Sequence, residues 1–144
     1  MGYTHHWNTK TEISQVQFNA IGDDLKRVIK ACNDAGIKIC GGLGCDKPVI
    51  NSDEILFNGC KADGKEYETC YTIRKENRQY FCKTERMPYD IAVTTFLIIC
   101  KHYLGDDIEV KSDGKNKGFN SARIFCDKVL GYGLDFVSDD KPQN

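Results

Sequence analysis

The chain has 144 residues, with 20 Lys and Arg against 21 Asp and Glu, and a formal net charge of −1 at pH 7. This length is typical of one domain with a core that needs no disulfide or metal for its stability. The balanced charge argues against duplex nucleic acid or an anionic membrane as a partner, because both attract a clustered positive surface. No apolar run reaches the roughly 18 residues that a membrane span requires.

The first eight residues hold two of the three histidines and the single tryptophan. Chain ends are usually polar and frayed, so this content predicts a strand over residues 3–8 that is tied into the fold. Neighbouring residues of a strand face opposite sides, and His5 and His6 therefore cannot serve one site. The start lacks a basic segment followed by an apolar one, so no secretory signal and a cytoplasmic location are expected.

Residues 12–35 carry apolar side chains at three- and four-residue steps, which is typical of a helix. Gly22 is a candidate break, in which case Asp23 or Asp24 would begin the main helix, and Gly36 is a good C-terminal stop. Residues 37–40 alternate like a short strand. The glycine-rich run 41–44 fits no nucleotide-binding fingerprint and predicts a turn with positive φ.

Three strands are predicted next, over residues 54–58, 66–74 and 78–86, joined by short polar links that are typical of antiparallel hairpins. Pro88 then opens the most apolar predicted helix, which ends near Gly105. A strand over 108–111, a turn at 112–114 and a last helix over 119–130 follow.

This order predicts an α+β fold with a mostly antiparallel sheet of about five to six strands packed against two or three helices. We expect one domain over residues 1–136 and a polar C-terminal tail over residues 137–144.

The eight cysteines are expected to be reduced thiols that are mostly buried, because several occupy apolar positions and free cysteine behaves as a small hydrophobe. The alternative is a zinc site built from Cys40, Cys45 and Cys60. The absence of a C-x-x-C pair speaks against it, and we expect no metal and no cofactor.

The candidate ligand site lies where the strand over 78–86 runs into the following helix. A helix N-terminus offers unpaired N–H groups and Arg86 adds a guanidinium, an arrangement that suits a phosphate or carboxylate. Asp90 is the counter-argument, since its carboxylate could cap the same helix or pair with Arg86. Ser112 and Asp113 form a second polar corner, which as a turn needs no function.

Aromatic side chains near an arginine can hold a nucleotide base, and Tyr3, Trp7 and Tyr89 are the candidates for stacking. The alternative is that these rings belong to the core. His5 is a ligand-contact residue in this interpretation, or a general base if the protein is an enzyme.

Three ordered elements carry a resemblance: the start at 2–7, the segment 81–90, and the Ser-Asp-Gly turn at 112–114. They resemble a family of small phage and prophage proteins that begin G-Y-T-H-[YH]-W and carry [KT]-x-R-x-P-Y-D and S-D-G elements. The resemblance implies a phage setting, and His6 and Phe119 depart from the family pattern. Carried over residue by residue, it points at Tyr3, His5, Trp7, Thr84, Arg86, Tyr89, Asp90, Ser112 and Asp113.

Small phage proteins with a polar, aromatic pocket are often inhibitors of host defence, and some sequester nucleotide signals. We therefore expect a protein of the host cytoplasm that binds a small anionic, nucleotide-like ligand without catalysis and contains no catalytic residue. Thr84, Ser112 and Asp113 would bond the hydroxyls of the ligand. The alternatives are a small hydrolase or phosphodiesterase, with His5 as base and Asp90 or Asp113 orienting it, and a protein–protein inhibitor. Assembly into a homo-oligomer is left open.

Overall fold

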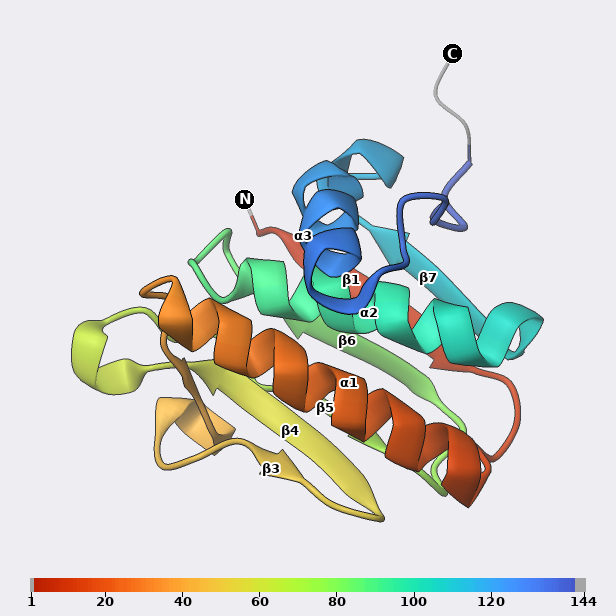
Figure 1. Cartoon of the computed structure of the whole chain (residues 1–144), viewed down its shortest axis with the longest axis horizontal. Coiled ribbons are helices and arrows are strands. Elements are labelled where there is room, and N and C mark those ends of the chain that lie inside the picture. Colours follow the sequence, from red (N-terminus) through yellow and green to blue (C-terminus); the bar gives the residue numbers. More distant parts are fainter. Residues whose placement is uncertain (1, 142–144) are drawn as a thin grey trace.

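The computed structural model describes residues 2–141 of the chain and confirms an α+β fold in one compact domain (Figure 1). It contains seven strands and three helices in this range, against the five to six strands expected. The strand that was not expected covers residues 49–50 and is only two residues long. The elements are β1 (Thr4–Thr9), α1 (Gln15–Asp34), β2 (Ile39–Cys40), β3 (Val49–Ile50), β4 (Glu54–Gly59), β5 (Cys70–Ile73), β6 (Gln79–Lys83), α2 (Asp90–Leu104), β7 (Ile108–Ser112) and α3 (Asn120–Leu130).

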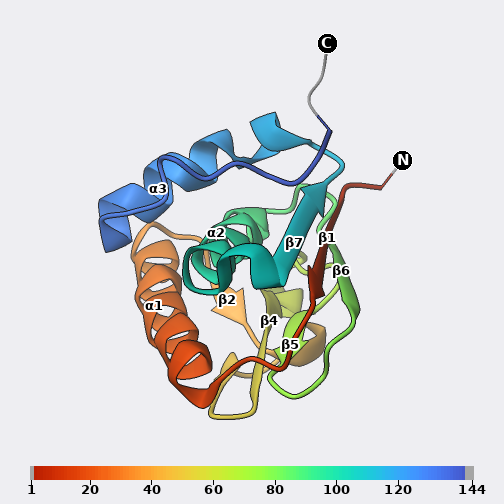
Figure 2. The same ribbon diagram turned by 90° about the vertical axis from the view of Figure 1, so that its right-hand side faces the viewer.

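The strands form two antiparallel sheets. The first has the order β6-β1-β7, so the N-terminal strand lies at its centre. In the second, β4 pairs with β2, β3 and β5. The helices lie together on one side of the strands, and Figure 2 shows the two layers edge-on.

Helix α2 is the centre of the core. Every residue from Ala92 to Cys100 is buried, because α1 and α3 cover it on the side away from the sheets (Figure 1). This position explains the apolar run in the sequence, which packs on all sides within the protein. In residues 2–141, no helix combines the length and the apolar character needed to cross a membrane.

Helix α1 runs through Gly22, so the candidate break at this glycine does not occur. Ser14 caps its start by accepting a hydrogen bond from the Gln17 backbone at 3.1 Å. A Cβ atom at Gly22 would lie 3.0 Å from the side chain of Ile50, so this glycine allows β3 to approach the helix. The helix ends at Asp34 and Gly36 has a φ of +85°, as predicted for the stop.

The expectation of reduced cysteines is wrong for one pair. Cys40 at the end of β2 and Cys60 just after β4 form a disulfide, with Cα atoms 5.1 Å apart. Pairing of β2 with β4 brings these two side chains together, and it removes two of the three thiols considered for zinc. Of the remaining six cysteines, Cys45 is exposed and the other five are buried.

The C-terminal segment protects an edge of the first sheet. The backbone N–H of Asp139 donates to the Val110 carbonyl at 2.7 Å, and the Asp139 carboxylate accepts from the Val110 N–H at 2.8 Å. Residues expected to begin a polar tail thus satisfy the outer groups of β7, and residues 142–144 lie outside the described range.

Candidate functional site

Three segments far apart in the sequence meet at one end of the first sheet. In the antiparallel register His5 lies opposite Cys82 on one side and opposite Ser112 on the other. The Tyr3 carbonyl accepts the Thr84 N–H at 3.0 Å. We call the region formed by Tyr3, His5, Thr84, Glu85, Arg86, Asp90, Ser112 and Asp113 the N-terminal corner. It brings together seven of the nine residues expected to contact a ligand.

A chain of side-chain hydrogen bonds runs through this corner. Ser112 Oγ lies 2.8 Å from His5 Nδ1, and His5 Nε2 lies 2.6 Å from Asp90 Oδ1. The Thr84 hydroxyl donates to the same Asp90 oxygen at 2.5 Å. The neutral imidazole with its proton on Nε2 satisfies every contact, because it then accepts from Ser112 and donates to Asp90.

Burial along the chain shows which end is accessible. His5 is fully buried and Ser112 is 3% exposed, whereas the Asp90 side chain is 22% exposed. Serine, histidine and aspartate in series are the groups of a nucleophile, a base and an orienting acid. Here, however, the serine is the covered end and only the carboxylate reaches solvent. The chain therefore joins β1, β7 and the start of α2 and leaves Asp90 as its surface group.

Tyr3 covers Ser112. Its ring lies edge-on to the His5 ring, with centroids 5.1 Å apart. Its hydroxyl occupies a space between two glycines, since a Cβ at Gly114 would lie 2.1 Å from that oxygen and one at Gly118 would lie 2.7 Å from it. Burial raises the pKa of Tyr3, and the negative charge of Asp90 acts in the same direction. The glycine of the Ser-Asp-Gly turn is thus required by the N-terminal tyrosine.

Arg86 lies over the outer side of Tyr3, with its guanidinium carbon 3.8 Å from the ring centroid. Glu85 and Arg86 both have left-handed backbone conformations, with φ of +52° and +58°. Such conformations cost about 1–3 kcal/mol each for residues other than glycine, and they concentrate at functional sites. Glu85 accepts the Tyr3 N–H at 2.9 Å, which ties the strained turn to β1.

A hollow of about 270 Å³ opens beside this turn and is lined by Gly2, Tyr3, Glu85 and Arg86. Within residues 2–141, Arg86 has no hydrogen-bond or ion-pair partner, so all of its N–H donors remain available. The three carboxylates of the corner each accept a hydrogen bond from the protein: Asp90 from Thr84, Glu85 from Tyr3 and Asp113 from the Thr4 N–H at 2.9 Å. Arg86 is therefore the charged group of the corner that makes no hydrogen bond to the rest of residues 2–141, although the three carboxylates keep their negative charge.

Two of the expected stacking residues lie elsewhere. Trp7 is 1% exposed, stacks on Tyr80 and donates to the Thr72 hydroxyl at 3.1 Å. Tyr89 is equally buried, and its hydroxyl donates to the Glu68 carbonyl at 2.6 Å. Burial also raises the pKa of Tyr89. Both rings belong to the core, because the face of β1 and the first turn before α2 are covered by other elements.

Sequence reasoning missed Glu85, Gly114 and Gly118. Glu85 and Arg86 would face opposite sides if the predicted strand over 78–86 were continuous. The strand instead ends at Lys83, and the left-handed turn brings both residues to one hollow. The two glycines carry no chemical signal of their own. Their role depends on the position of the Tyr3 hydroxyl, which only the tertiary structure defines.

Comparison with protein-family models, with curated proteins and with solved structures finds no match to this chain. The fold and the site define a single-domain α+β protein in which, over residues 2–141, the Arg86 guanidinium lies without a partner on a hydrogen-bonded aromatic corner. Its function is accordingly inferred from this geometry.

Proposed function

We propose that the protein binds a small anionic ligand, derived from a nucleotide, at the N-terminal corner and does not transform it. The observation that carries the proposal is the Arg86 guanidinium, which has no partner within residues 2–141 and lies over the Tyr3 ring at the edge of the hollow. A guanidinium offers five N–H donors in a planar fork that matches phosphate and carboxylate groups.

The surroundings of Arg86 support this assignment. The contact with the Tyr3 ring already restricts the Arg86 side chain, so less side-chain freedom is lost when an anion binds. Arg86 is exposed, so its guanidinium can also stack on a planar base. The strained turn at Glu85 and Arg86 holds this side chain away from the carboxylate of Asp90, and no Arg86–Asp90 ion pair forms.

In a phage setting, which the resemblance of the three sequence elements implies, such a protein would act by sequestering a nucleotide signal of host defence. A binding protein needs no accessible nucleophile, and the burial of His5 and Ser112 is consistent with that role. Ligand removal from solution would then depend on the affinity and the concentration of the protein.

The hydrogen-bonded series Ser112–His5–Asp90 favours a second candidate, a small hydrolase acting on the same ligand class. In that case Tyr3 would have to move before Ser112 or His5 could contact a substrate. Asp90 would keep the imidazole in position, as the acid does in serine hydrolases.

The test is thermal unfolding in the presence of cyclic and linear nucleotides and of inorganic phosphate. A ligand at one hundred times its Kd stabilises a protein by about 2.7 kcal/mol, which a melting curve resolves. Arg86→Ala should remove the stabilisation. Arg78→Ala is the matched control, because Arg78 also lies over tyrosine rings but at the opposite end of β6.

Chromatography of the ligand after incubation and denaturation separates the two candidates. Intact recovery supports the binding protein, and a product whose formation requires His5 supports the hydrolase. If the ligand still stabilises the Arg86→Ala variant, the N-terminal corner is not the ligand site in either the binding protein or the hydrolase.

A further inference from the structure

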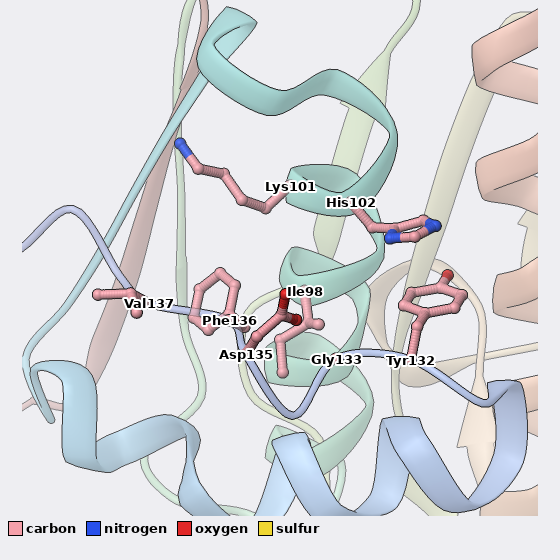
Figure 3. Close-up of a pocket in the computed structure, with 8 residues that line it drawn as sticks. All are labelled: Ile98, Lys101, His102, Tyr132, Gly133, Asp135, Phe136 and Val137. Atoms are coloured by element: carbon pink, nitrogen blue, oxygen red, sulfur yellow. The ribbon is translucent and has the colours of Figure 1, made fainter.

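A second hollow, of about 330 Å³, lies between α2 and the irregular segment that follows α3 (Figure 3). Its walls come from both elements, and its residues are Ile98, Lys101, His102, Tyr132, Gly133, Asp135, Phe136 and Val137. None of them belongs to the N-terminal corner. The volume is at the lower end of the range found for small-molecule pockets.

The irregular wall is held at three points. The Tyr132 hydroxyl donates to Asp24 at 2.7 Å, and the Arg123 guanidinium donates to the Phe136 carbonyl at 2.7 Å. Between them Gly133 has a φ of +111° and lies so close to α3 that a Cβ would be 2.9 Å from the Cys126 sulfur. A segment without regular structure that is fixed in this way presents its side chains in one arrangement.

Aromatic rings form much of the lining. His102 stacks on Tyr132 with centroids 3.7 Å apart and planes within 13°. Figure 3 shows this stacked pair on one side of the hollow and Phe136 on the other, with Ile98 and Asp135 between them. The Tyr132 hydroxyl donates its hydrogen bond to the Asp24 carboxylate, which raises the electron density on the oxygen and on the ring. The face of an electron-rich ring attracts cations.

Within the described part of the chain, the positive group of this pocket has partners and the negative group has none, whereas in the corner the guanidinium is the group without a partner. Lys101 extends away from the hollow (Figure 3) and donates to the Ile108 carbonyl at 2.8 Å and to Asp139 at 3.1 Å. Asp135 is exposed and has no hydrogen-bond or ion-pair partner in the part of the chain from residue 2 to residue 141. The Arg123 guanidinium, whose carbon lies 5.6 Å from the Phe136 ring centroid, donates to the Phe136 and Asn116 carbonyls. Within that range, the charged group without a partner beside the aromatic rings is therefore the Asp135 carboxylate.

We propose that this pocket binds a small organic cation with a flat, apolar body. The ammonium group pairs with Asp135, and the body lies against Phe136 and the His102–Tyr132 stack. Leu134 and Val137, 59% and 64% exposed, extend the apolar rim. This pocket shares no residue with the N-terminal corner, so the proposal for one site can be wrong while the proposal for the other holds.

The test uses three probes of one shape and different charge: phenethylammonium, 2-phenylethanol and phenylacetate. They are titrated into ¹⁵N-labelled protein at pH 8, above the range in which histidine ordinarily gains a proton. Amide shifts should appear at Gly133, Asp135 and Val137 with phenethylammonium, and the other two probes should bind at least about threefold more weakly, as expected for an exposed ion pair together with a cation–π contact.

Asp135→Asn should weaken phenethylammonium binding about fivefold and leave 2-phenylethanol unchanged. Asp46→Asn is the matched control, since Asp46 is an exposed aspartate in the loop before β3 and asparagine tolerates its positive φ. The proposal is overturned by shifts confined to other residues, by equal binding of the neutral probe, or by unchanged binding in Asp135→Asn.

Discussion

The N-terminal corner and the pocket over α2 contain the same kinds of groups in opposite states of pairing. In the corner the carboxylates accept hydrogen bonds from the protein, and within residues 2–141 the Arg86 guanidinium has no such partner. Over α2 the Lys101 ammonium is paired and the Asp135 carboxylate has no partner in the same range. The chain as a whole is nearly neutral. Which charged group lacks a partner in the protein therefore says more about ligands than net charge does.

The two regions also differ in how they are held. Buried side chains from three segments bond to one another in the corner, whereas the pocket wall is fixed mainly where it passes over α1 and α3. A buried network leaves unsatisfied groups when one member is removed. Substitutions in the corner should consequently affect the stability of the whole domain more than those around the pocket.

The largest effect is expected for His5→Ala. Loss of the imidazole leaves Ser112 and Asp90 without their shared partner and opens a cavity, so the free energy of unfolding should fall by about 3 kcal/mol. Urea denaturation of the variant and the parent protein measures this difference in the free energy of unfolding. His6→Ala, one residue along on the other face of β1, should change it by less than about 0.5 kcal/mol. Equal losses in the two variants would mean that the network contributes nothing specific.

Gly114→Ala should destabilise the protein by about 2 kcal/mol, because its Cβ collides with the Tyr3 hydroxyl. Tyr3→Phe removes that oxygen, and the double variant should recover at least half of the loss. Gly42→Ala is the control, since its Cβ would meet only Leu56 at 3.6 Å. Additive losses for Gly114→Ala and Tyr3→Phe would show that the tyrosine and the turn do not interlock.

Asp24→Ala removes one acceptor shared by two tyrosine hydroxyls, Tyr103 at 2.6 Å and Tyr132 at 2.7 Å. The loss should be about 1.5 kcal/mol, and Asp23→Ala beside it should be close to neutral. The hydrogen bond to Asp24 also raises the pKa of Tyr103 from 10.0 to about 12. The native state therefore holds its proton longer than the unfolded state, and this stabilisation is full below pH 10 and lost between pH 10 and 12.

Ultraviolet titration of the tyrosines follows this change directly. In Asp24→Ala the ionisation of Tyr103 should shift toward 10, and the decline of stability at alkaline pH should become shallower. Identical titration curves for the variant and the parent protein would contradict the assignment of Asp24 as the cause.

The smallest effect on stability is expected for Arg86→Asn, within about 0.5 kcal/mol. Asparagine adopts the left-handed conformation more readily than arginine, and this gain offsets the lost contact with Tyr3. Ligand binding should nevertheless disappear, as in Arg86→Ala. A large loss of stability, measured by urea denaturation, would instead make Arg86 a structural residue.

Periodicity in the sequence predicted the fold class and most elements, because helices and strands that bury one face must repeat apolar residues at a matching period. It failed at Gly22, where the glycine serves contact with Ile50 inside a continuous helix. The cysteine pattern failed for Cys40 and Cys60, which only the pairing of β2 with β4 places side by side.

The residue types at the candidate site were also visible in the sequence, because a guanidinium, a histidine and a Ser-Asp-Gly turn can be named from the chain alone. Their roles were not. Tertiary structure decided that an exposed Arg86 packs on a largely buried Tyr3 while Trp7 and Tyr89 lie in the core, and that Ser112 is covered while Asp90 is partly exposed. The physical reason is that burial and pairing depend on neighbours dozens of residues away, whereas periodicity reflects only the local chain.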